Sequence, residues 1–313
     1  MKDQHLISVI MPCYNSAKTL ESSIASVLLQ TYEHLELIVV DDGSTDSSPE
    51  LLSRLKDKDM RIVAIFGENR GAGPARNVGI RAARGRYVAF LDSDDTWAGD
   101  CLEKLCDGLI AHPEAALTYC GWQNLGLDPK MCMPHIPPDY EEGDKVEVFL
   151  RACPWPIHAA LVKREVLVEF GGFDEQWTSC MDFDLWLRLG AFRTVVRVPE
   201  VLAFYNHHSA DWRISLNRTR VSLNHWRIQL RFLSEHPEVA ARLGRAKVRD
   251  STHGELMRRG FEAYWKRDLA TARVLFREVM RQGYGEIKDW VYMVPSLLPE
   301  LWHSRLIAFI EKG

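Results

Sequence analysis

Paired cysteines, long apolar runs and low-complexity segments are all missing from this sequence of 313 residues. Its seven cysteines include no Cys-x-x-Cys pair, and an odd, unpaired set argues against both a disulfide framework and a zinc knuckle. No stretch holds the roughly 18 consecutive apolar residues that cross a bilayer. The N-terminal residues enter a strand-like segment without the apolar region of a secretion signal. We therefore expect a globular cytoplasmic protein with reduced thiols.

Charge is distributed unevenly along the chain. Residues 1–212 carry 20 Lys and Arg against 32 Asp and Glu, whereas residues 213–281 carry 16 against 7. A block of net charge +9 behind a block of −12 indicates an anionic partner. The other interpretation is a helical pair with solvated arginine faces. We expect no nucleic acid partner; an anionic lipid carrier at the inner face of the cell membrane fits this charge.

The first 91 residues alternate between short apolar runs and segments with helical spacing. Runs rich in β-branched residues predict buried strands, and apolar residues three or four apart predict helices. Strands are expected at residues 6–11, 35–40, 61–66 and 86–91, with helices at 19–30, 49–55 and 74–83. This order predicts an α/β domain with a Rossmann-like, mostly parallel sheet flanked by helices.

Polar segments follow three of these strands, at residues 12–15, 41–44 and 92–95. In doubly wound sheets, ligands bind outside the carboxyl ends of the strands. We therefore expect the three segments to share one edge of the sheet and to form a ligand site there.

The chain after residue 95 predicts a second set of elements. Helices are expected at residues 100–112, 146–152, 164–170 and 181–189, and strands at 116–122, 159–162 and 193–198. Residues 123–145 contain four prolines and no periodicity, which indicates a functional covering loop rather than scaffold. From residue 216 the pattern is helical, so we place two domains at residues 1–215 and 216–313.

The C-terminal region holds a helical pair and an aromatic tail. Residues 254–266 and 269–282 resemble a single tetratricopeptide-like hairpin, which is no repeat array and indicates packing support. The apolar tail at residues 290–302 is interrupted by Pro295 and Pro299. It either makes a peripheral membrane contact in the bilayer interface or folds back on the domain.

Three carboxylates stand within four residues, at Asp92, Asp94 and Asp95. Like charges so close together repel one another, and a divalent cation compensates for this repulsion. Oxygen ligands in a turn suit Mg²⁺ or Mn²⁺, which usually also binds phosphate oxygens. The other interpretation is a solvated acidic loop or a helix cap.

Four segments resemble, in order and at ordinary spacing, the signatures of the family 2 glycosyltransferases, an inverting group with the GT-A fold. They are residues 8–15 (SVIMPCYN), 39–46 (VVDDGSTD), 69–79 (NRGAGPARNVG) and 90–95 (FLDSDD). The resemblance implies a metal-dependent enzyme that moves a sugar from a nucleoside diphosphate sugar, with UDP as the expected nucleotide. It implies as acceptor a hydroxyl of a glycan or of a lipid-linked molecule, in the synthesis of cell-surface polysaccharide or glycoconjugate.

The resemblance also assigns residues of the nucleotide-sugar site. It implies that Pro12 and Tyr14 border the nucleobase and that Asp42 accepts a hydrogen bond from the base. A tyrosine face suits stacking on a pyrimidine, and a carboxylate suits its ring N–H. Arg76 and Asn77 are expected to lie near the donor.

Within the acidic cluster, the resemblance leaves two metal frames open, Asp92-Ser93-Asp94 and Asp94-Asp95. We expect Asp94 to contact ribose or metal and Asp95 to coordinate the metal, with Asp92 as the alternative ligand. Asp94 belongs to both frames, and Ser93 is placed among the donor contacts. His208 is expected to complete the metal shell or to donate to the leaving diphosphate. His208 ends the segment Tyr205-Asn206-His207-His208, which resembles the family's Tyr-Arg-x-His turn. In this segment, Asn206 stands where the family has an arginine.

Residues 171–175 followed by Met181 and Asp182 resemble the segment in which an acidic pair opens a helix near the acceptor. The family commonly has Glu-Asp there, and this chain keeps the second carboxylate. We expect Asp182 to be the general base that removes the proton of the acceptor hydroxyl. Asp184 is the alternative base, but on a helix that begins at Met181 it points about 200° away from Asp182.

His158 and Trp122 fall where the family's acceptor cleft is lined, or else they are packing residues. Two other functions stay open. A non-catalytic nucleotide-sugar-binding scaffold is suggested by Met181 and Asn206. A sugar-nucleotide pyrophosphorylase also uses acidic metal ligands, but it is expected to have a basic, glycine-rich loop that residues 11–15 lack. A Gly-x-Gly-x-x-Gly sequence of a dinucleotide-binding enzyme is absent from the same place.

Overall fold

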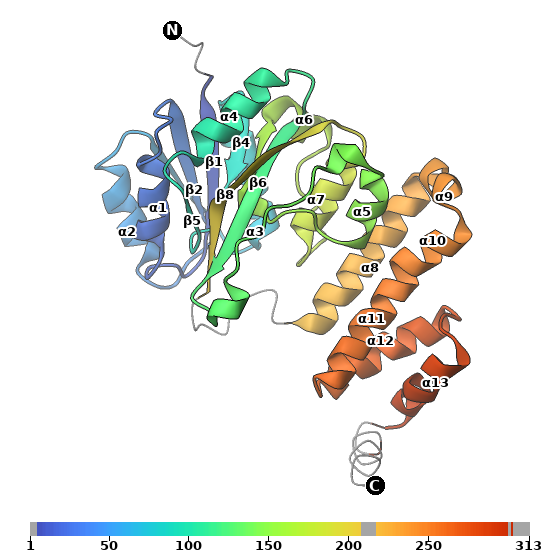
Figure 1. Ribbon diagram of the computed structural model, residues 1–313. Coiled ribbons are helices and arrows are strands. Elements are labelled where there is room, and N and C mark those ends of the chain that lie inside the picture. Colours follow the sequence, from blue (N-terminus) through green and yellow to red (C-terminus); the bar gives the residue numbers. More distant parts are fainter. Residues whose placement is uncertain (1–4, 208–216, 300–301, 303–313) are drawn as a thin grey trace. The chain divides into compact units, whose positions relative to one another are not determined.

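The chain forms two compact units in the computed structural model, which describes residues 5–207, 217–299 and 302 (Figure 1). One unit holds residues 1–149 and 153–210, and the other holds residues 150–152 and 211–313. The predicted boundary at residue 215 lies outside the described residues.

The first unit is built on a sheet of eight strands, in the order β3-β2-β1-β4-β7-β6-β8-β5. These strands are β1 (Ile7–Cys13), β2 (Leu35–Asp41), β3 (Ile62–Phe66), β4 (Tyr87–Phe90), β5 (Thr96–Trp97), β6 (Leu117–Leu125), β7 (Ala160–Lys163) and β8 (Val195–Asn206). The first four pair in parallel, and so do β6 and β8. Strand β7 runs antiparallel to β4 and β6, and β5 runs antiparallel to β8. The prediction of an α/β unit with a mostly parallel sheet is confirmed.

The described residues of the first unit form seven α-helices, and α5 runs on into residues 150 and 151. They are α1 (Leu20–Leu28), α2 (Ser48–Lys56), α3 (Ala72–Ala82), α4 (Cys101–Ala111), α5 (Lys145–Arg151), α6 (Arg164–Glu169) and α7 (Met181–Gly190). Every residue of β1 and β2 is buried, as expected for parallel strands covered on both faces. Helix α3 approaches β1 so closely that a Cβ on Gly79 would lie 2.4 Å from Cγ2 of Ile10.

Strand β6 is longer than the sequence predicts, because it continues to Leu125. The prediction of a loop is therefore wrong for residues 123–125. The remaining stretch contains two short 3₁₀ turns, η1 (Pro129–Met131) and η2 (Tyr140–Glu142). Strand β5 was not predicted from the sequence.

The loop after β6 returns along this strand and is held through its backbone. Trp122 and His135 exchange two backbone hydrogen bonds of 2.9 and 2.8 Å. The Gln123 amide donates to the carbonyl of Cys132 at 2.8 Å. Met133, in contrast, leaves 68% of its surface exposed. The fold of this loop thus depends on main-chain atoms more than on its side chains.

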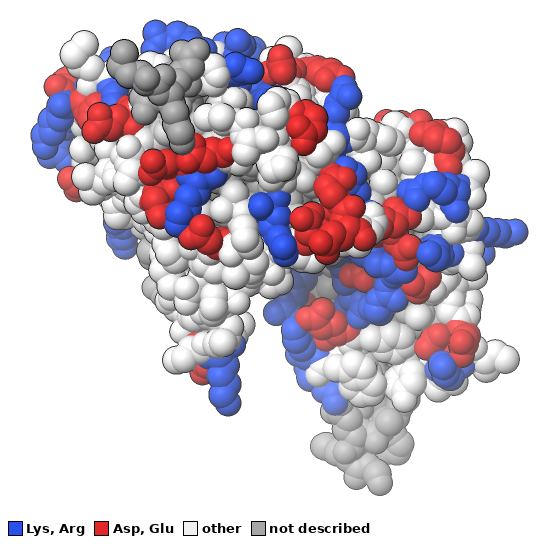
Figure 2. Space-filling model, turned by 45° about the horizontal axis from the view of Figure 1, so that its top comes forward, with Lys and Arg blue, Asp and Glu red and all other residues white. Residues whose placement is uncertain are grey.

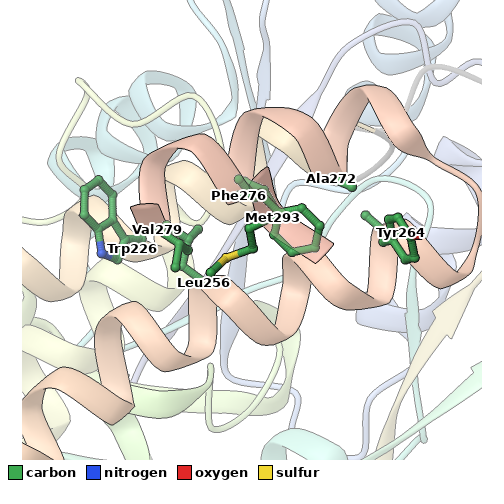
Figure 3. Close-up of a cluster of buried hydrophobic side chains, with 9 residues drawn as sticks. Trp226, Leu256, Tyr264, Ala272, Phe276, Val279 and Met293 are labelled. Atoms are coloured by element: carbon green, nitrogen blue, oxygen red, sulfur yellow. The ribbon is translucent and has the colours of Figure 1, made fainter. Parts of the chain in front are cut away.

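The second unit is helical throughout its described residues, which confirms the predicted C-terminal helical region. Its elements are α8 (Arg218–Glu235), α9 (Pro237–Leu243), α10 (Arg245–Arg249), a π-helical turn η5 (Asp250–Gly254), α11 (Glu255–Trp265), α12 (Leu269–Arg281), α13 (Ile287–Met293) and η6 (Val294–Leu297). Figure 3 shows its core, in which Phe276 of α12 and Leu256 of α11 pack with Met293 of α13.

The aromatic tail folds back on the helical pair. Met293 is fully buried, and Trp290 packs against the same core. The guanidinium groups of Arg273 and Arg277 donate to the carbonyl of Ser296 at 3.1 and 2.8 Å. These contacts fix residues 290–298 on α12, so of the two predicted placements this part of the tail adopts the folded-back one.

Many arginines of the basic block are paired within the second unit. Salt bridges join Arg231 to Glu235, Arg259 to Glu255 and Arg281 to Glu278, among others. Basic and acidic side chains are interspersed over the face drawn in Figure 2. No helix among the described residues is long and apolar enough to cross a membrane.

Candidate active site

Three polar segments meet at one edge of the sheet, as the sequence predicts. In the parallel registers, Cys13 of β1 lies beside Asp41 of β2, and Ile10 lies beside Phe90 of β4. The residues that follow these strands are therefore neighbours. The Ser16 and Ser93 hydroxyls lie 2.7 Å apart and join the first segment to the acidic turn. This edge is the candidate site.

The residues expected at the nucleobase lie at the ends of β1 and β2. Pro12 is buried, whereas Tyr14 leaves 40% of its surface exposed and presents an accessible ring. Asp42 is buried, and its two carboxylate oxygens accept backbone hydrogen bonds from Arg70 at 2.9 Å and Gly71 at 2.8 Å. Asp42 thereby fixes the segment that leads into α3.

Arg76, in α3, connects the acidic turn to the start of α7. This residue is only 5% exposed, and its Nη2 donates to Oδ1 of Asp92 at 2.5 Å. Its Nη1 donates to the Met181 sulfur at 3.3 Å, and the guanidinium carbon lies 5.5 Å from the centroid of the Phe173 ring. A thioether is a weak acceptor, so Asp92 supplies the stronger of these contacts.

Asn77 fastens the loop that precedes α7. Its amide nitrogen donates to the Phe173 carbonyl at 2.8 Å and to Glu175 at 3.0 Å, and its oxygen accepts from the Phe173 N–H at 2.9 Å. Gly172 has φ +67°, and a Cβ at this position would lie 2.7 Å from the Asn77 oxygen. Only glycine fits this loop without displacement. The expected contact of Asn77 with the donor stays a prediction.

The acidic turn presents its side chains in alternating directions. Asp92 is 30% exposed and Asp94 is half-buried, whereas Ser93 and Asp95 are buried. Oδ1 of Asp95 accepts a hydrogen bond of 2.9 Å from the backbone of Asn206, and the Asn206 amide donates to the Asp94 carbonyl at 3.1 Å. Asn206, the residue that replaces the expected arginine, thus ties the end of β8 to this turn.

The carboxylate oxygens of this turn suit a hard divalent cation that also binds phosphate oxygens. The described residues contain no group of three or more His, Cys, Asp or Glu side chains arranged to hold a metal ion. Mg²⁺ and Mn²⁺ often use one or two carboxylates and complete their shell with phosphate oxygens. The partly exposed carboxylates of Asp92 and Asp94 fit that pattern. His208, the other predicted ligand, lies outside the described residues.

Asp182 lies at the start of α7, in the first unit. Oδ1 of this carboxylate accepts a hydrogen bond of 2.9 Å from the Phe183 N–H, and Oδ2 lies 3.8 Å from the Cys153 sulfur. Burial raises the pKa of Asp182 above its ordinary value, while the Phe183 hydrogen bond and the charge of Arg76 act in the opposite direction. The result is a half-buried carboxylate with increased proton affinity, which suits a general base.

Asp184, the alternative base, is engaged elsewhere. Its carboxylate is 2% exposed and pairs with Arg188 at 2.8 Å. Arg188 also donates to the carbonyls of Phe170 and Gly172. Asp184 therefore holds α7 to the loop before it.

The two residues expected in the acceptor cleft differ in exposure. His158 is fully buried in a 3₁₀ turn, η3 (Ile157–Ala159), and its carbonyl accepts a hydrogen bond of 2.7 Å from the indole of Trp97. Trp122 is half-buried, with its ring centroid 4.3 Å from that of His135. Their acceptor roles stay predictions. Cys153, beside Asp182, was not predicted, because the two residues are 29 positions apart in the sequence.

Comparisons with known proteins identify sequences similar to this chain. The family described as "Glycosyl transferase family 2" matches residues 8–167. An uncharacterized glycosyltransferase of Nostoc sp. is 44% identical over 215 residues, which cover 67% of this chain and 67% of the relative. A UDP-Glc:alpha-D-GlcNAc-diphosphoundecaprenol beta-1,3-glucosyltransferase of Escherichia coli, WfgD, is 46% identical over 102 residues, 32% of this chain and 40% of the relative. For three further relatives, this chain spans 40%, 60% and 65% of their lengths.

A solved structure has a similar fold. The mannosyltransferase PcManGT of Pyrobaculum calidifontis, in complex with GDP-Man and Mn²⁺, aligns with a TM-score of 0.56 at 19% sequence identity. The alignment covers 97% of this chain and 83% of that protein. At this identity the similarity concerns the fold, which is the GT-A arrangement that the sequence signatures imply.

Proposed function

Because the chain belongs to glycosyl transferase family 2, we propose that it transfers a sugar, with inversion, from a nucleoside diphosphate sugar to an acceptor hydroxyl. UDP is the proposed nucleotide, and a glycan or lipid-linked molecule of cell-surface polysaccharide or glycoconjugate synthesis is the proposed acceptor. The observation that carries the proposal is the Arg76 bridge, which joins the acidic turn at Asp92 to the first turn of α7, where Asp182 stands.

Asp182 acts as the base in this reaction. The acceptor oxygen attacks the anomeric carbon from the face opposite the diphosphate, so that a new carbon–oxygen bond forms as the bond to the diphosphate breaks. The proton of the acceptor hydroxyl passes to the Asp182 carboxylate. A positioned base typically accelerates such a step by about 10²–10⁴-fold. The raised pKa of Asp182 supports this role.

The donor lies along the strand ends. Tyr14 stacks on the base with its exposed ring, and Asp42 faces the ring N–H while it holds Arg70 and Gly71. Arg76, with Asp92, lies toward the donor. The polar edge of the sheet and the family signatures support these positions.

Asp92 and Asp94 are the proposed ligands of Mn²⁺ or Mg²⁺, in place of the expected pair Asp94 and Asp95, because Asp95 is only 1% exposed. The hard oxygen donors of the turn support this assignment, as does the Mn²⁺ in the structure of PcManGT. Such an ion, when bound, neutralises charge on the diphosphate leaving group.

A lipid-linked acceptor implies work at the inner face of the membrane, with the protein in the cytoplasm. The name of WfgD, which includes diphosphoundecaprenol, supports such an acceptor. In the second unit, Ile287 and Val291 are 87% and 67% exposed on the outer side of α13 and support a peripheral contact. Deleting the tail at residues 290–302 would not test this membrane contact by itself, because the deletion also removes Met293 from the core of the second unit. We expect Ile287→Ser with Val291→Ser to lower co-sedimentation with anionic vesicles; unchanged co-sedimentation would contradict the contact.

A donor screen tests the proposed function. The full chain is incubated with UDP- and GDP-sugars in Mn²⁺, Mg²⁺ or chelator, and nucleotide release is measured. We expect metal-dependent release of UDP, and a slower release without acceptor. Asp182→Asn should abolish transfer while UDP binding, measured by calorimetry, stays close to wild type. Loss of UDP binding in this variant would show that the base assignment is wrong.

One observation favours a second candidate, a nucleotide-sugar-binding protein without transferase activity. Met181 places a thioether, rather than a second carboxylate, against Arg76 at the start of α7. Tight UDP-sugar binding without nucleotide release, across donors and acceptors, would support this candidate. The pyrophosphorylase alternative predicts consumption of a nucleoside triphosphate with a sugar phosphate, which the same assay detects.

A further inference from the structure

His158 and Asn206 are far apart in the sequence, and both contact Asp95 of the acidic turn. Oδ2 of Asp95 lies 3.2 Å from Nδ1 of His158, and the two side chains are 1% and 0% exposed. Oδ1 of the same carboxylate accepts the backbone hydrogen bond of Asn206 at 2.9 Å. The last described residues of β8 and the turn η3 thus both contact the one carboxylate of the turn that is buried.

The His158 ring is held on other sides as well. Its backbone carbonyl accepts from Trp97 at 2.7 Å, and the Tyr205 ring centroid lies 5.7 Å from that of His158. Of the two ring nitrogens, Nδ1 is the one that faces the Asp95 carboxylate.

An imidazole is a costly side chain for this position. Neither ring nitrogen makes a well-aligned hydrogen bond within the described part of the chain, although Nδ1 is close to Asp95. An unsatisfied buried polar group costs about 1–3 kcal/mol, so the imidazole Nε2 lowers the stability of this core. A residue that lowers stability at a ligand site indicates a role in positioning.

We propose that His158 is a positioning residue of the donor site: through Asp95 it holds the acidic turn in the shape that directs Asp92 and Asp94 toward the ligand. The proposal rests on the proposed function. It assigns Asp95 to bracing rather than to metal coordination, and of the two predicted frames it selects Asp92-Ser93-Asp94. His158 then acts behind the donor and not on the acceptor.

Two substitutions separate positioning from packing. His158→Asn keeps an N–H donor near the place of Nδ1, whereas His158→Leu fills similar space without a donor. His225→Leu is the matched control, because it removes a buried histidine from the second unit. Each variant of the full chain is measured for melting temperature, for UDP affinity by calorimetry with and without Mn²⁺, and for the Mn²⁺ concentration that gives half-maximal activity.

We expect His158→Leu to weaken Mn²⁺-dependent UDP binding by about 10-fold or more, as removal of partners behind metal ligands typically does. His158→Asn should recover most of this loss, and His225→Leu should leave UDP affinity unchanged. Wild-type UDP affinity in a folded His158→Leu protein would overturn the proposal.

Asp95→Asn gives an independent result if His158→Leu does not fold. A bracing role predicts a partial, about 10-fold, loss of Mn²⁺-dependent UDP binding. Complete loss of binding in Asp95→Asn would instead make Asp95 a metal ligand and overturn the proposal. Absence of nucleotide binding by the wild-type chain would overturn the proposed function, and this inference with it.

Discussion

Replacing Asn77 with alanine tests whether the loop before α7 sets the position of Asp182. The substitution removes the hydrogen bonds of Asn77 to the backbone N–H and carbonyl of Phe173. Asn77 is 8% exposed, so these two backbone groups lose their partners where water has little access. An unsatisfied buried group costs about 1–3 kcal/mol, and about 1.5 kcal/mol for each gives about 3 kcal/mol. At about 2–4 °C for each kcal/mol in a unit of this size, the melting temperature should fall by about 6–12 °C.

The effect on activity should exceed the effect on donor affinity. Loosening the loop displaces the start of α7, whereas Tyr14 and Asp42 directly follow β1 and β2. We expect kcat to fall about 10-fold or more, because small misplacements of reacting groups have large effects, and the UDP dissociation constant to change by a smaller factor. Gln176→Ala, in the same loop but exposed, is the matched control. A wild-type melting temperature and kcat in Asn77→Ala would refute this reasoning.

Four further outcomes are expected. The transfer rate should fall on acidification at a pH above the ordinary aspartate value of about 3.9, because the pKa of Asp182 is raised and the base must be ionised; a kcat/KM profile that is flat to pH 4 would contradict this. Asp182→Asn should melt at a higher temperature than wild type at pH 7, because the folded chain carries the desolvated carboxylate at a cost; the difference should disappear below the unfolded-state pKa, where both states are protonated. Gly79→Val should destabilise the first unit by about 1–3 kcal/mol in urea denaturation, because even a Cβ there would lie 2.4 Å from Ile10; equal midpoints would argue against this close packing. Chelation should stop nucleotide release, and added Mn²⁺ or Mg²⁺ should restore it; release that persists in chelator would exclude the proposed metal.

Local sequence patterns were sufficient for most of the fold. Apolar runs such as residues 35–40 are long enough and bounded clearly enough to predict a buried strand, and the structure has β2 at Leu35–Asp41. Strand β5 has only two residues and carries no periodicity. Its position depends on pairing with β8, more than a hundred residues further along the chain. Such an element is determined by tertiary contacts and leaves no local signal.

The candidate site could likewise be predicted only where the sequence carries a local signal. Asp42, Asp92 and Asp94 follow strands, so the topology of a parallel sheet brings them to one edge. The side-chain direction within the acidic turn could not be predicted, because it depends on distant partners of Asp95. Sequence spacing also gave no sign that His158 would be enclosed, since its burial depends on β5 and the end of β8.

The way in which the loop after β6 is attached has a consequence for how its sequence can vary between relatives. Its hydrogen bonds to β6 end on main-chain atoms, at Cys132 and His135. Main-chain atoms are common to all sequences, so the exposed side chains of Met131 and Met133 are replaceable without loss of these attachments. A loop attached in this way can accumulate substitutions while the sheet beneath it stays intact. Exchanging its exposed residues between relatives is therefore a test of whether this predicted covering loop influences the acceptor, with the donor edge left unchanged.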